Sequence, residues 1–246
     1  MTPGEPRLLL LATTNGDKVR EIQHLLRLVP VRLVDLASLP RVAEPEESGA
    51  TFVENARLKA LYYDAHLSRH AATASTTAAT AASTTASTTA STTSAGGALP
   101  ARVLTIAEDS GLQIDALDGA PGVHSARFLR PDASYPERFA EIYRRLGARA
   151  DAPRTARFLC AIAVVDAGRV CFETTGVVEG RIADQPRGTQ GFGYDPIFWY
   201  PPLAATLAEI AESDKLAVAH RGHAFRRLAQ WLATTNPRRE VRSERA

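Results

Sequence analysis

The first residues that could do chemistry follow an apolar segment at positions 8–12. Thr13, Asn15 and Lys18 come directly after it, and the apolar residues further along recur at a spacing that predicts a helix. Backbone N–H groups at a helix N-terminus attract anions, and a lysine one turn into the helix adds a full positive charge. The group therefore predicts a polyphosphate-binding loop, although an ordinary helix cap with a solvated lysine has the same spacing.

Two acidic clusters supply the oxygen atoms that a hard cation prefers. Glu46 and Glu47 precede a Ser-Gly pair, whereas Glu108 and Asp109 precede Ser110 and a glycine between two apolar segments. If the two clusters meet in the fold they could hold Mg²⁺, and a carboxylate beside the metal could take a proton from water. Sequence alone does not show that they meet, and the glutamates at 46 and 47 fit solvated loop charges at least as well.

A fourth cluster combines glycines with aromatic and charged residues, in the order Gly188, Gly191, Phe192, Gly193, Tyr194, Asp195, Lys215, His220 and Arg221. Glycine lets a ligand approach the backbone, aromatic faces stack on bases, and charged groups can read a base edge. The cluster therefore predicts a purine site. In the alternative interpretation the two aromatic residues lie in the core, Asp195 caps a turn, and the three basic residues lie on a solvated helix face.

Composition and missing motifs narrow the classes of function. The 246 residues carry 29 Lys plus Arg against 27 Asp plus Glu, so bulk charge gives no support for nucleic-acid binding. No apolar run approaches the ~18 residues needed to cross a bilayer, and the N-terminal leucines make a poor secretory signal, so we expect a cytoplasmic protein without membrane contact. P-loop, Rossmann, zinc-protease and serine-hydrolase motifs are absent, so any nucleotide site must be built in another way.

Strand-like and helix-like periods alternate along the chain, which predicts an α/β fold with a mixed sheet. Strands are expected over residues 8–12, 103–107, 112–117, 157–165, 169–175 and 177–182. Helices are expected after the turn at Asn15 and over residues 51–66, 134–146, 206–212 and 221–232. Thr51 with Glu54 and Ser134 with Glu137 match capping boxes at two of these starts.

One segment has a composition of its own, since residues 71–95 contain only Ala, Thr and Ser. Without large apolar side chains this stretch cannot offset the ~1–2 kcal/mol per residue of backbone ordering entropy. We therefore expect a disordered insertion over residues 71–97. The basic tail over residues 237–246 is expected to fray, which leaves residues 1–236 as one interrupted domain.

Taken together and in this order, the clusters resemble the inosine/xanthosine triphosphate pyrophosphatase family, whose members clear deaminated purine nucleotides. The similarity covers nearly the whole chain and runs through ATTNGDKVREI, EESGATFVENARLKA, IAEDSGLQIDALDGAPGVHSARF, RTARFLCAIAVV, GFGYDPIF and LAEIAESDKLAVAHRGHAF. Any one of these strings is modest evidence, but six in register are hard to obtain by chance.

The resemblance implies an elongated central sheet, two lobes around a nucleotide cleft, and a homodimer. It implies hydrolysis of ITP, dITP and XTP to the monophosphate and pyrophosphate, with Mg²⁺ as cofactor. The family's acidic metal position falls on Glu46, with Glu47 as a close second candidate, and its catalytic, metal-binding carboxylate falls on Asp109. The substrate-binding residues that it implies are Thr13, Thr14, Asn15, Gly16, Asp17, Lys18, Ser110, Phe192, Gly193, Tyr194, Asp195, Lys215, His220 and Arg221.

The Ala/Ser/Thr insertion departs from the family pattern, and we expect it to loop out without moving Asp109. Three single positions differ as well. Thr14 stands where many relatives have glycine, which requires a negative φ in the phosphate loop. Ala219 replaces a serine that is common before the His-Arg pair, which removes a possible hydroxyl contact with the base, and Glu108 stands where another aspartate is usual.

The mechanism that the resemblance implies uses Asp109 to activate a water that attacks the α-phosphorus. Donors from His220, Arg221 or Lys215 would favour purines that carry an oxygen at position six over ATP. Two alternatives stay open: a pyrophosphatase for pyrimidine or modified nucleotides, and a nucleotide-binding sensor without turnover. The acidic pair argues against the sensor, because a binder gains little from carboxylates that face phosphates.

Overall fold

The computed structural model describes residues 7–36, 42–82, 103–149 and 151–235. Its strands are β1 (Arg7–Leu11), β2 (Val31–Asp35), β3 (Val103–Ile114), β4 (Thr155–Asp166), β5 (Arg169–Ile182), β6 (Phe198–Tyr200) and β7 (Ala205–Thr206). Its α-helices are α1 (Gly16–Leu26), α2 (Phe52–Ala82), α3 (Tyr135–Gly147), α4 (Glu212–Val218) and α5 (His220–Thr234). Short 3-10 helices are η2 (Asp115–Leu117), η3 (Gly122–Arg127), η4 (Asp195–Ile197) and η5 (Pro201–Leu203).

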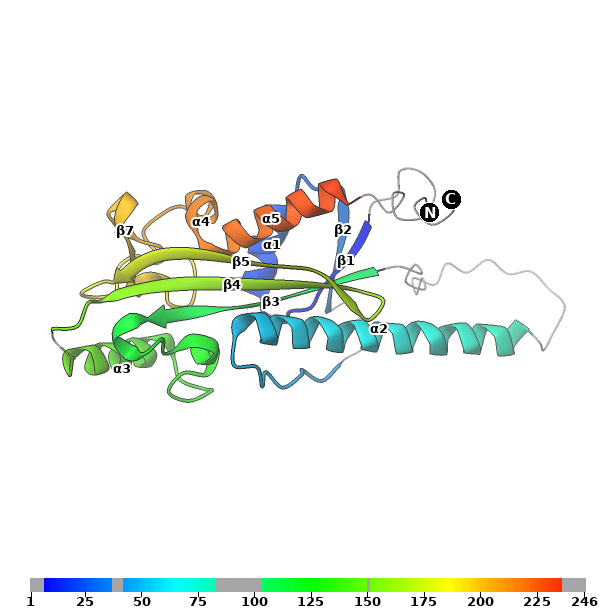
Figure 1. Ribbon diagram of the computed structural model, residues 1–246, viewed down its shortest axis with the longest axis horizontal. Helices are drawn as coiled ribbons and strands as arrows, with labels where there is room; N and C mark the ends of the chain where they lie inside the picture. The colour runs from blue at the N-terminus through cyan, green and yellow to red at the C-terminus, as the bar shows by residue number, and fades with distance from the viewer. Residues whose placement is uncertain (1–6, 37–41, 83–102, 150, 236–246) are drawn as a thin grey trace, which may run out of the picture.

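Within these ranges the strands form one seven-stranded sheet in the order β2-β1-β3-β4-β5-β6-β7 (Figure 1). β1 pairs in parallel with β2 and with β3. From β3 onward each strand pairs antiparallel with the next. This mixed sheet with flanking helices confirms the predicted α/β class, whereas the division into two lobes stays a prediction.

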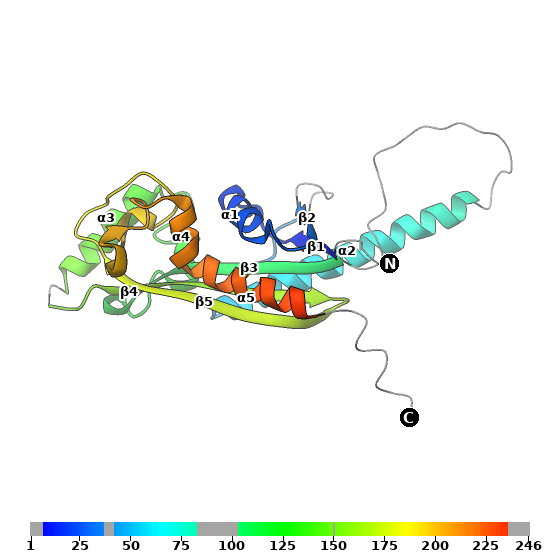
Figure 2. The same ribbon diagram turned by 90° about the horizontal axis from the view of Figure 1, so that it is seen from above.

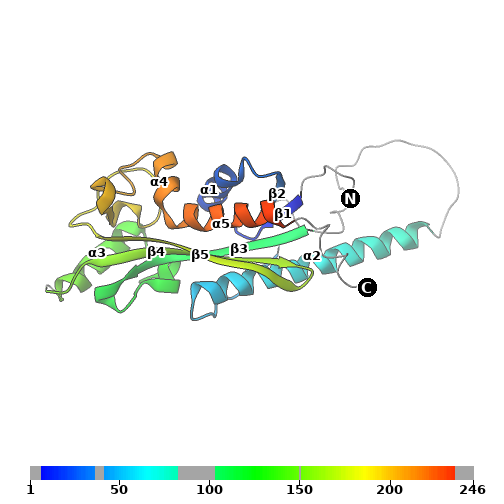
Figure 3. The ribbon, with the colours of Figure 1, turned by 45° about the horizontal axis from the view of Figure 1, so that its top comes forward.

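Helices cover both faces of the sheet: α1 and α5 lie on one face and α2 and α3 on the other (Figures 1 and 3). The alternation of side chains along β1 explains how one strand serves both layers. Leu9 and Leu11 pack in the core with α1 and α5, whereas Leu10 packs against α2. A strand that is buried on both faces reads as a continuous apolar run, as residues 8–12 do.

Local signals predicted several element boundaries correctly. The backbone N–H of Glu54 donates to Oγ1 of Thr51, and the Glu54 carboxylate accepts from the Thr51 N–H, so the first capping box is confirmed. The second is confirmed at Ser134 and Glu137 by the same reciprocal pair. The β4–β5 hairpin also turns where predicted, at residues 167–168, both of which have positive φ.

The acidic cluster at residues 108–111 lies inside β3, so the prediction of two separate strands on either side of it was wrong. The whole segment pairs with β4, with Asp109 opposite Ala161 and Ser110 opposite Cys160. Backbone hydrogen bonds to a long neighbouring strand hold these polar residues extended, a constraint that no local pattern reveals. β5 likewise runs as one strand through the two segments that were expected separately.

α2 is longer than predicted. It continues past residue 66 to Ala82 and extends beyond the end of the sheet (Figure 2), so residues 71–82 of the expected disordered insertion are helical. Alanine has the highest helix propensity, and adding a residue to an existing helix is much easier than nucleating one. Residues 83–102, which hold the rest of that insertion, and the predicted frayed tail lie outside the described residues.

The prediction of a helix over residues 206–212 was wrong. Thr206 pairs with Trp199 at the edge of the sheet, and α4 begins only at Glu212. Pairing in the sheet outweighs the weak helical pattern of this short segment. None of the helices in the described part of the chain is long and apolar enough to cross a membrane.

Candidate active site

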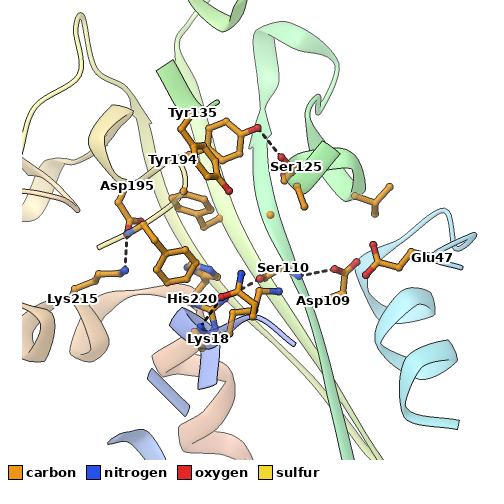
Figure 4. Close-up of a pocket in the computed structure, with 18 residues that line it drawn as sticks. Lys18, Glu47, Asp109, Ser110, Ser125, Tyr135, Tyr194, Asp195, Lys215 and His220 are labelled. Atoms are coloured by element: carbon orange, nitrogen blue, oxygen red, sulfur yellow. Dashed lines mark hydrogen bonds and ion pairs between the residues drawn. The ribbon is translucent and has the colours of Figure 1, made fainter. Parts of the chain in front are cut away.

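A cavity of about 720 Å³, counted with the solvent at its mouth, opens where the start of α1, the middle of β3 and the loop before η4 meet. Its lining residues are Asn15, Lys18, Glu47, Asp109, Ser110, Gly111, Val123, Ser125, Ala126, Tyr135, Phe158, Phe192, Gly193, Tyr194, Asp195, Lys215, His220 and Arg221. Figure 4 shows their side chains converging from separate elements. The clusters found in the sequence therefore share one site.

The start of α1 forms the first wall of the cavity. Asn15 is the N-cap, and its Oδ1 accepts hydrogen bonds from the backbone N–H groups of Asp17 at 2.9 Å and Lys18 at 3.1 Å. Nζ of Lys18 lies 2.5 Å from Oε1 of Glu108 on β3. Burial by itself would raise the pKa of Glu108, but Lys18 and Arg221 lower it well below its usual range, so this carboxylate is ionised.

The rest of the predicted phosphate loop does not line this cavity. Thr14 donates its hydroxyl to Oε1 of Glu44 at 2.6 Å, and the Thr13 hydroxyl accepts from the Asn15 backbone at 3.3 Å. Asp17 lines a neighbouring cavity instead. The φ of Thr14 is not positive, so the loop accommodates a β-branched residue as required. Substrate contacts of Thr13, Thr14, Gly16 and Asp17 stay predictions.

The two acidic clusters meet around a lysine of α2. Nζ of Lys59 lies 2.8 Å from Oε1 of Glu47 and 3.4 Å from Oδ1 of Asp109. Asn55, one turn earlier on the same helix, donates to Oδ2 of Asp109 at 3.1 Å. The convergence that the sequence left open is therefore present, and α2 supplies the groups that join the two carboxylates.

Glu47, and not Glu46, is the glutamate that faces the cavity. Glu46 is exposed and does not line the cavity, whereas Glu47 is half-buried there. Arg127 of η3 donates from NH1 to Oε2 of Glu47 at 2.9 Å and from NH2 to the Glu47 carbonyl oxygen at 3.3 Å. Of the two glutamates, Glu47 is therefore the one that lines the cavity, where its contacts with Arg127 hold it, and the metal-binding role of either residue stays a prediction.

The electrostatics of this acidic pair follow from burial and its basic neighbours. Burial raises the pKa of Asp109 above its usual range, and Lys59 opposes this rise only in part. Burial would also raise the pKa of Glu47, but Lys59 and Arg127 lower it below the usual range. Burial would lower the pKa of Lys59, yet its carboxylate neighbours raise it, so the ammonium stays charged. No group of three or more His, Cys, Asp or Glu side chains could hold a metal within the described residues.

The other end of the cavity combines an aromatic ring with buried cations. Two cations lie over the Phe192 ring. Nζ of Lys215 is 4.8 Å from the ring centroid, and Cζ of Arg221 is 5.5 Å from it. The His220 ring stacks on Phe158 with centroids 4.8 Å apart. Burial lowers the pKa of His220 well below its usual range, and its Nδ1 has no hydrogen-bond partner among the described residues. The imidazole is therefore neutral near pH 7.

A buried carboxylate of α1 joins these cations. Oε1 of Glu21 lies 2.8 Å from Nζ of Lys215, and its Oε2 lies 2.5 Å from NH1 of Arg221. Lys215 also contacts Oδ2 of Asp195 at 2.6 Å, and NH2 of Arg221 donates to Oγ of Ser110 at 3.0 Å. All three basic residues of the predicted cluster are buried, so the alternative of a solvated helix face is wrong.

The segment η3 closes the cavity against β3. A Cβ on Gly111 would lie 2.3 Å from Oγ of Ser125, so only glycine lets η3 approach here. The Ser125 hydroxyl accepts from the Leu112 N–H at 3.0 Å, and the Ser125 carbonyl accepts from the Tyr194 hydroxyl at 2.8 Å. Close packing of η3 on β3 therefore explains why a glycine follows Ser110.

Sequence reasoning missed several residues of this site, namely Glu21, Asn55, Lys59, Ser125, Arg127, Tyr135 and Phe158. The sequence could have indicated Asn55 and Lys59, because polar residues four positions apart lie on the same face of a predicted helix. No sequence pattern could have indicated Glu21, since its partners lie about 200 positions away in the chain.

Comparisons with known proteins place the chain in a family. A model of the Ham1 family matches residues 9–231. A dITP/XTP pyrophosphatase of Geobacter sulfurreducens is 38% identical over 224 residues, which are 91% of this chain and 96% of the relative. A dITP/XTP pyrophosphatase of Coxiella burnetii is 37% identical over 229 residues, covering 91% of this chain and 96% of that protein.

The fold agrees with solved structures. A HAM1 protein from Coxiella burnetii has a TM-score of 0.71 at 33% identity, covering 93% of this chain and all of that one. The Staphylococcus aureus Ham1 protein has a TM-score of 0.68 at 28% identity over 92% of this chain and 98% of that one. The resemblance drawn from the sequence motifs is thereby confirmed: this chain belongs to the Ham1 family.

Proposed function

We propose that this protein hydrolyses ITP, dITP and XTP to the monophosphate and pyrophosphate, which removes deaminated purines from the nucleotide pool. One observation carries the proposal: a single cavity contains Lys18 at a helix N-terminus, the carboxylates Glu47 and Asp109, and Phe192 beside buried cations. These groups suit a triphosphate, a divalent cation and a purine ring, respectively. The relatives named dITP/XTP pyrophosphatase support the same substrate class.

We further propose that the cofactor is Mg²⁺, held by Glu47 and Asp109. The donor set fits, because both carboxylates already face one shared cation, the ammonium of Lys59. Mg²⁺ commonly binds one or two protein carboxylates together with substrate phosphates and water, so a larger protein cage is not required. When bound, Mg²⁺ would neutralise negative charge on the phosphate oxygens.

The chain's own residues perform the remaining steps. Lys18 binds the triphosphate at the start of α1, where the positive end of the helix dipole also attracts phosphate. Asp109 accepts a proton from the water that attacks the α-phosphorus, the bond from that phosphorus to the bridging oxygen breaks, and pyrophosphate leaves. Asn55 donates to Oδ2 of Asp109 and so fixes the orientation of the carboxylate.

Base selection rests on the buried donors at Lys215, His220 and Arg221. Hypoxanthine and xanthine present an oxygen acceptor at position six, whereas adenine presents an amine that would meet these donors without forming hydrogen bonds. A site that leaves buried polar groups unpaired can reject an analogue by ~10⁴-fold or more. We therefore expect a strong preference for ITP, dITP and XTP over ATP.

The test is turnover of a substrate panel with a matched pair of variants. Purified protein with Mg²⁺ is mixed with ITP, dITP, XTP, ATP or CTP, and the monophosphate and pyrophosphate are quantified. Asp109→Asn should lower kcat by roughly 10²–10⁴-fold, whereas Asp115→Asn, at an exposed aspartate outside the cavity, should leave it unchanged. Equal cleavage of ATP and ITP, or near-normal turnover by Asp109→Asn, contradicts the proposal.

We also propose, from the family resemblance, that the protein is a homodimer and, from its charge balance and short apolar runs, that it is cytoplasmic and binds neither nucleic acid nor membranes. Sedimentation velocity gives the oligomeric state directly, and a mass equal to a single chain at micromolar concentration would exclude the dimer.

A further inference from the structure

Two aromatic residues of the cavity, Tyr135 and Phe158, belong to none of the predicted clusters, and of these Tyr135 carries a hydroxyl. Tyr135 is the first residue of α3 and lines the cavity beside Tyr194. Figure 4 shows these two tyrosines together at the end of the cavity away from Lys18. If Lys18 holds the phosphates, this end receives the nucleoside.

The Tyr135 ring is held in place from several sides. Its backbone position is set by the capping box of Ser134, where α3 begins. The ring packs edge-to-face on Tyr194, with centroids 5.3 Å apart at 88°. The guanidinium of Arg138, itself buried, lies 4.9 Å from the ring centroid. A ring fixed in this way can offer a hydroxyl at a defined place without losing much conformational entropy on binding.

The hydroxyl of Tyr135 lies beside the loop that carries Phe192. A Cβ built on Gly193 would lie 3.5 Å from Oη of Tyr135, so the hydroxyl is close to the backbone immediately after Phe192. Burial raises the pKa of Tyr135, so the phenol keeps its proton at neutral pH. The group can then both donate and accept a hydrogen bond.

We propose that Tyr135 is a substrate-contacting residue whose hydroxyl forms a hydrogen bond with the nucleoside part of the bound nucleotide. This inference rests on the proposed function, because it takes Lys18 as the phosphate end of the cavity. The contact lies outside the phosphate and metal groups, so its loss weakens nucleotide binding and leaves binding of the phosphate chain alone unchanged.

The experiment compares Tyr135→Phe with Tyr143→Phe, a matched control on the same helix outside the cavity. For each protein we measure kcat and KM with ITP, and inhibition by inorganic tripolyphosphate, which has no nucleoside. Tyr135→Phe should raise KM for ITP by roughly three- to tenfold, the effect of one neutral hydrogen bond. Its inhibition constant for tripolyphosphate and all constants of Tyr143→Phe should match the wild type.

Two results would overturn the inference. One is an unchanged KM for Tyr135→Phe. The other is a parallel change in the ITP and tripolyphosphate constants, which indicates a general disturbance of the site. A comparison of ITP with dITP then locates the partner: an effect confined to ITP identifies the 2′-hydroxyl, and an equal effect on both identifies another group of the nucleoside.

Failure of the proposed function is a separate outcome, because the wild type would then release no IMP from ITP. The contact is still tested in that case by calorimetric titration of IMP into the wild type and Tyr135→Phe. Weaker binding by the variant supports the inference, and equal binding refutes it.

Discussion

Replacing Glu21 by glutamine should greatly destabilise the protein. The carboxylate is 3% exposed and contacts two cations, Lys215 and Arg221, which are 3% and 2% exposed. Glutamine keeps the size of the side chain and removes only its negative charge. Both buried cations then lose one of the carboxylates that neutralise them. Removing one partner of a buried ion pair typically costs about 3–5 kcal/mol, a large share of the ~5–15 kcal/mol that stabilises a domain.

The chain offers a matched control on its surface. Glu141 also contacts two arginines, at 2.8 Å and 2.6 Å, but these are 69% and 41% exposed. Pairs of this kind on a helix contribute about 0.3–0.5 kcal/mol each. Glu141→Gln should therefore cost no more than about 1 kcal/mol by the same rule.

Urea unfolding of the wild type and both variants measures the difference. With an unchanged slope m, the midpoint of Glu21→Gln should fall several times further than that of Glu141→Gln. For a chain of this length the loss at position 21 corresponds to a Tm lower by roughly 6–20 °C. Equal, small changes in both variants would refute the reasoning that burial, and not the number of ionic contacts, sets the cost.

Three further predictions concern packing, capping and metal binding. Gly222→Ala should cost about 1–3 kcal/mol in urea unfolding, because the new Cβ would lie 1.8 Å from the Leu216 carbonyl oxygen; Gly147→Ala, with nothing within 4 Å, should not destabilise. Ser134→Ala should cost about 1 kcal/mol by loss of the α3 cap, measured by calorimetry, and an unchanged Tm would contradict it. If Glu47 helps to hold Mg²⁺ as proposed, Arg127→Lys should raise the Mg²⁺ concentration for half-maximal activity several-fold, since lysine cannot make both contacts of Arg127 with Glu47. An unchanged Mg²⁺ requirement would show that Arg127 does not support the proposed site.

Local sequence signals predicted the elements that they control. Asn15 and Ser134 cap helices where expected, because a side-chain oxygen satisfies N–H groups within a few residues. Motif order predicted most of the cavity, including Lys18, Asp109 and Phe192. The caps could be predicted because their hydrogen bonds join residues that are close in the chain. The cavity residues could be predicted because their motifs occur in a recognisable order.

The sequence alone determined the mixed α/β class, the family and the chemical character of the site, since residue types and their order carry that information. Only the tertiary structure decided that Glu47 rather than Glu46 faces the cavity, and that Glu21 neutralises Lys215 and Arg221. It also decided that Asp109 lies within a continuous strand. These outcomes depend on long-range pairing between β3 and β4 and on charges brought together by burial, and no local pattern in the chain specifies either of them.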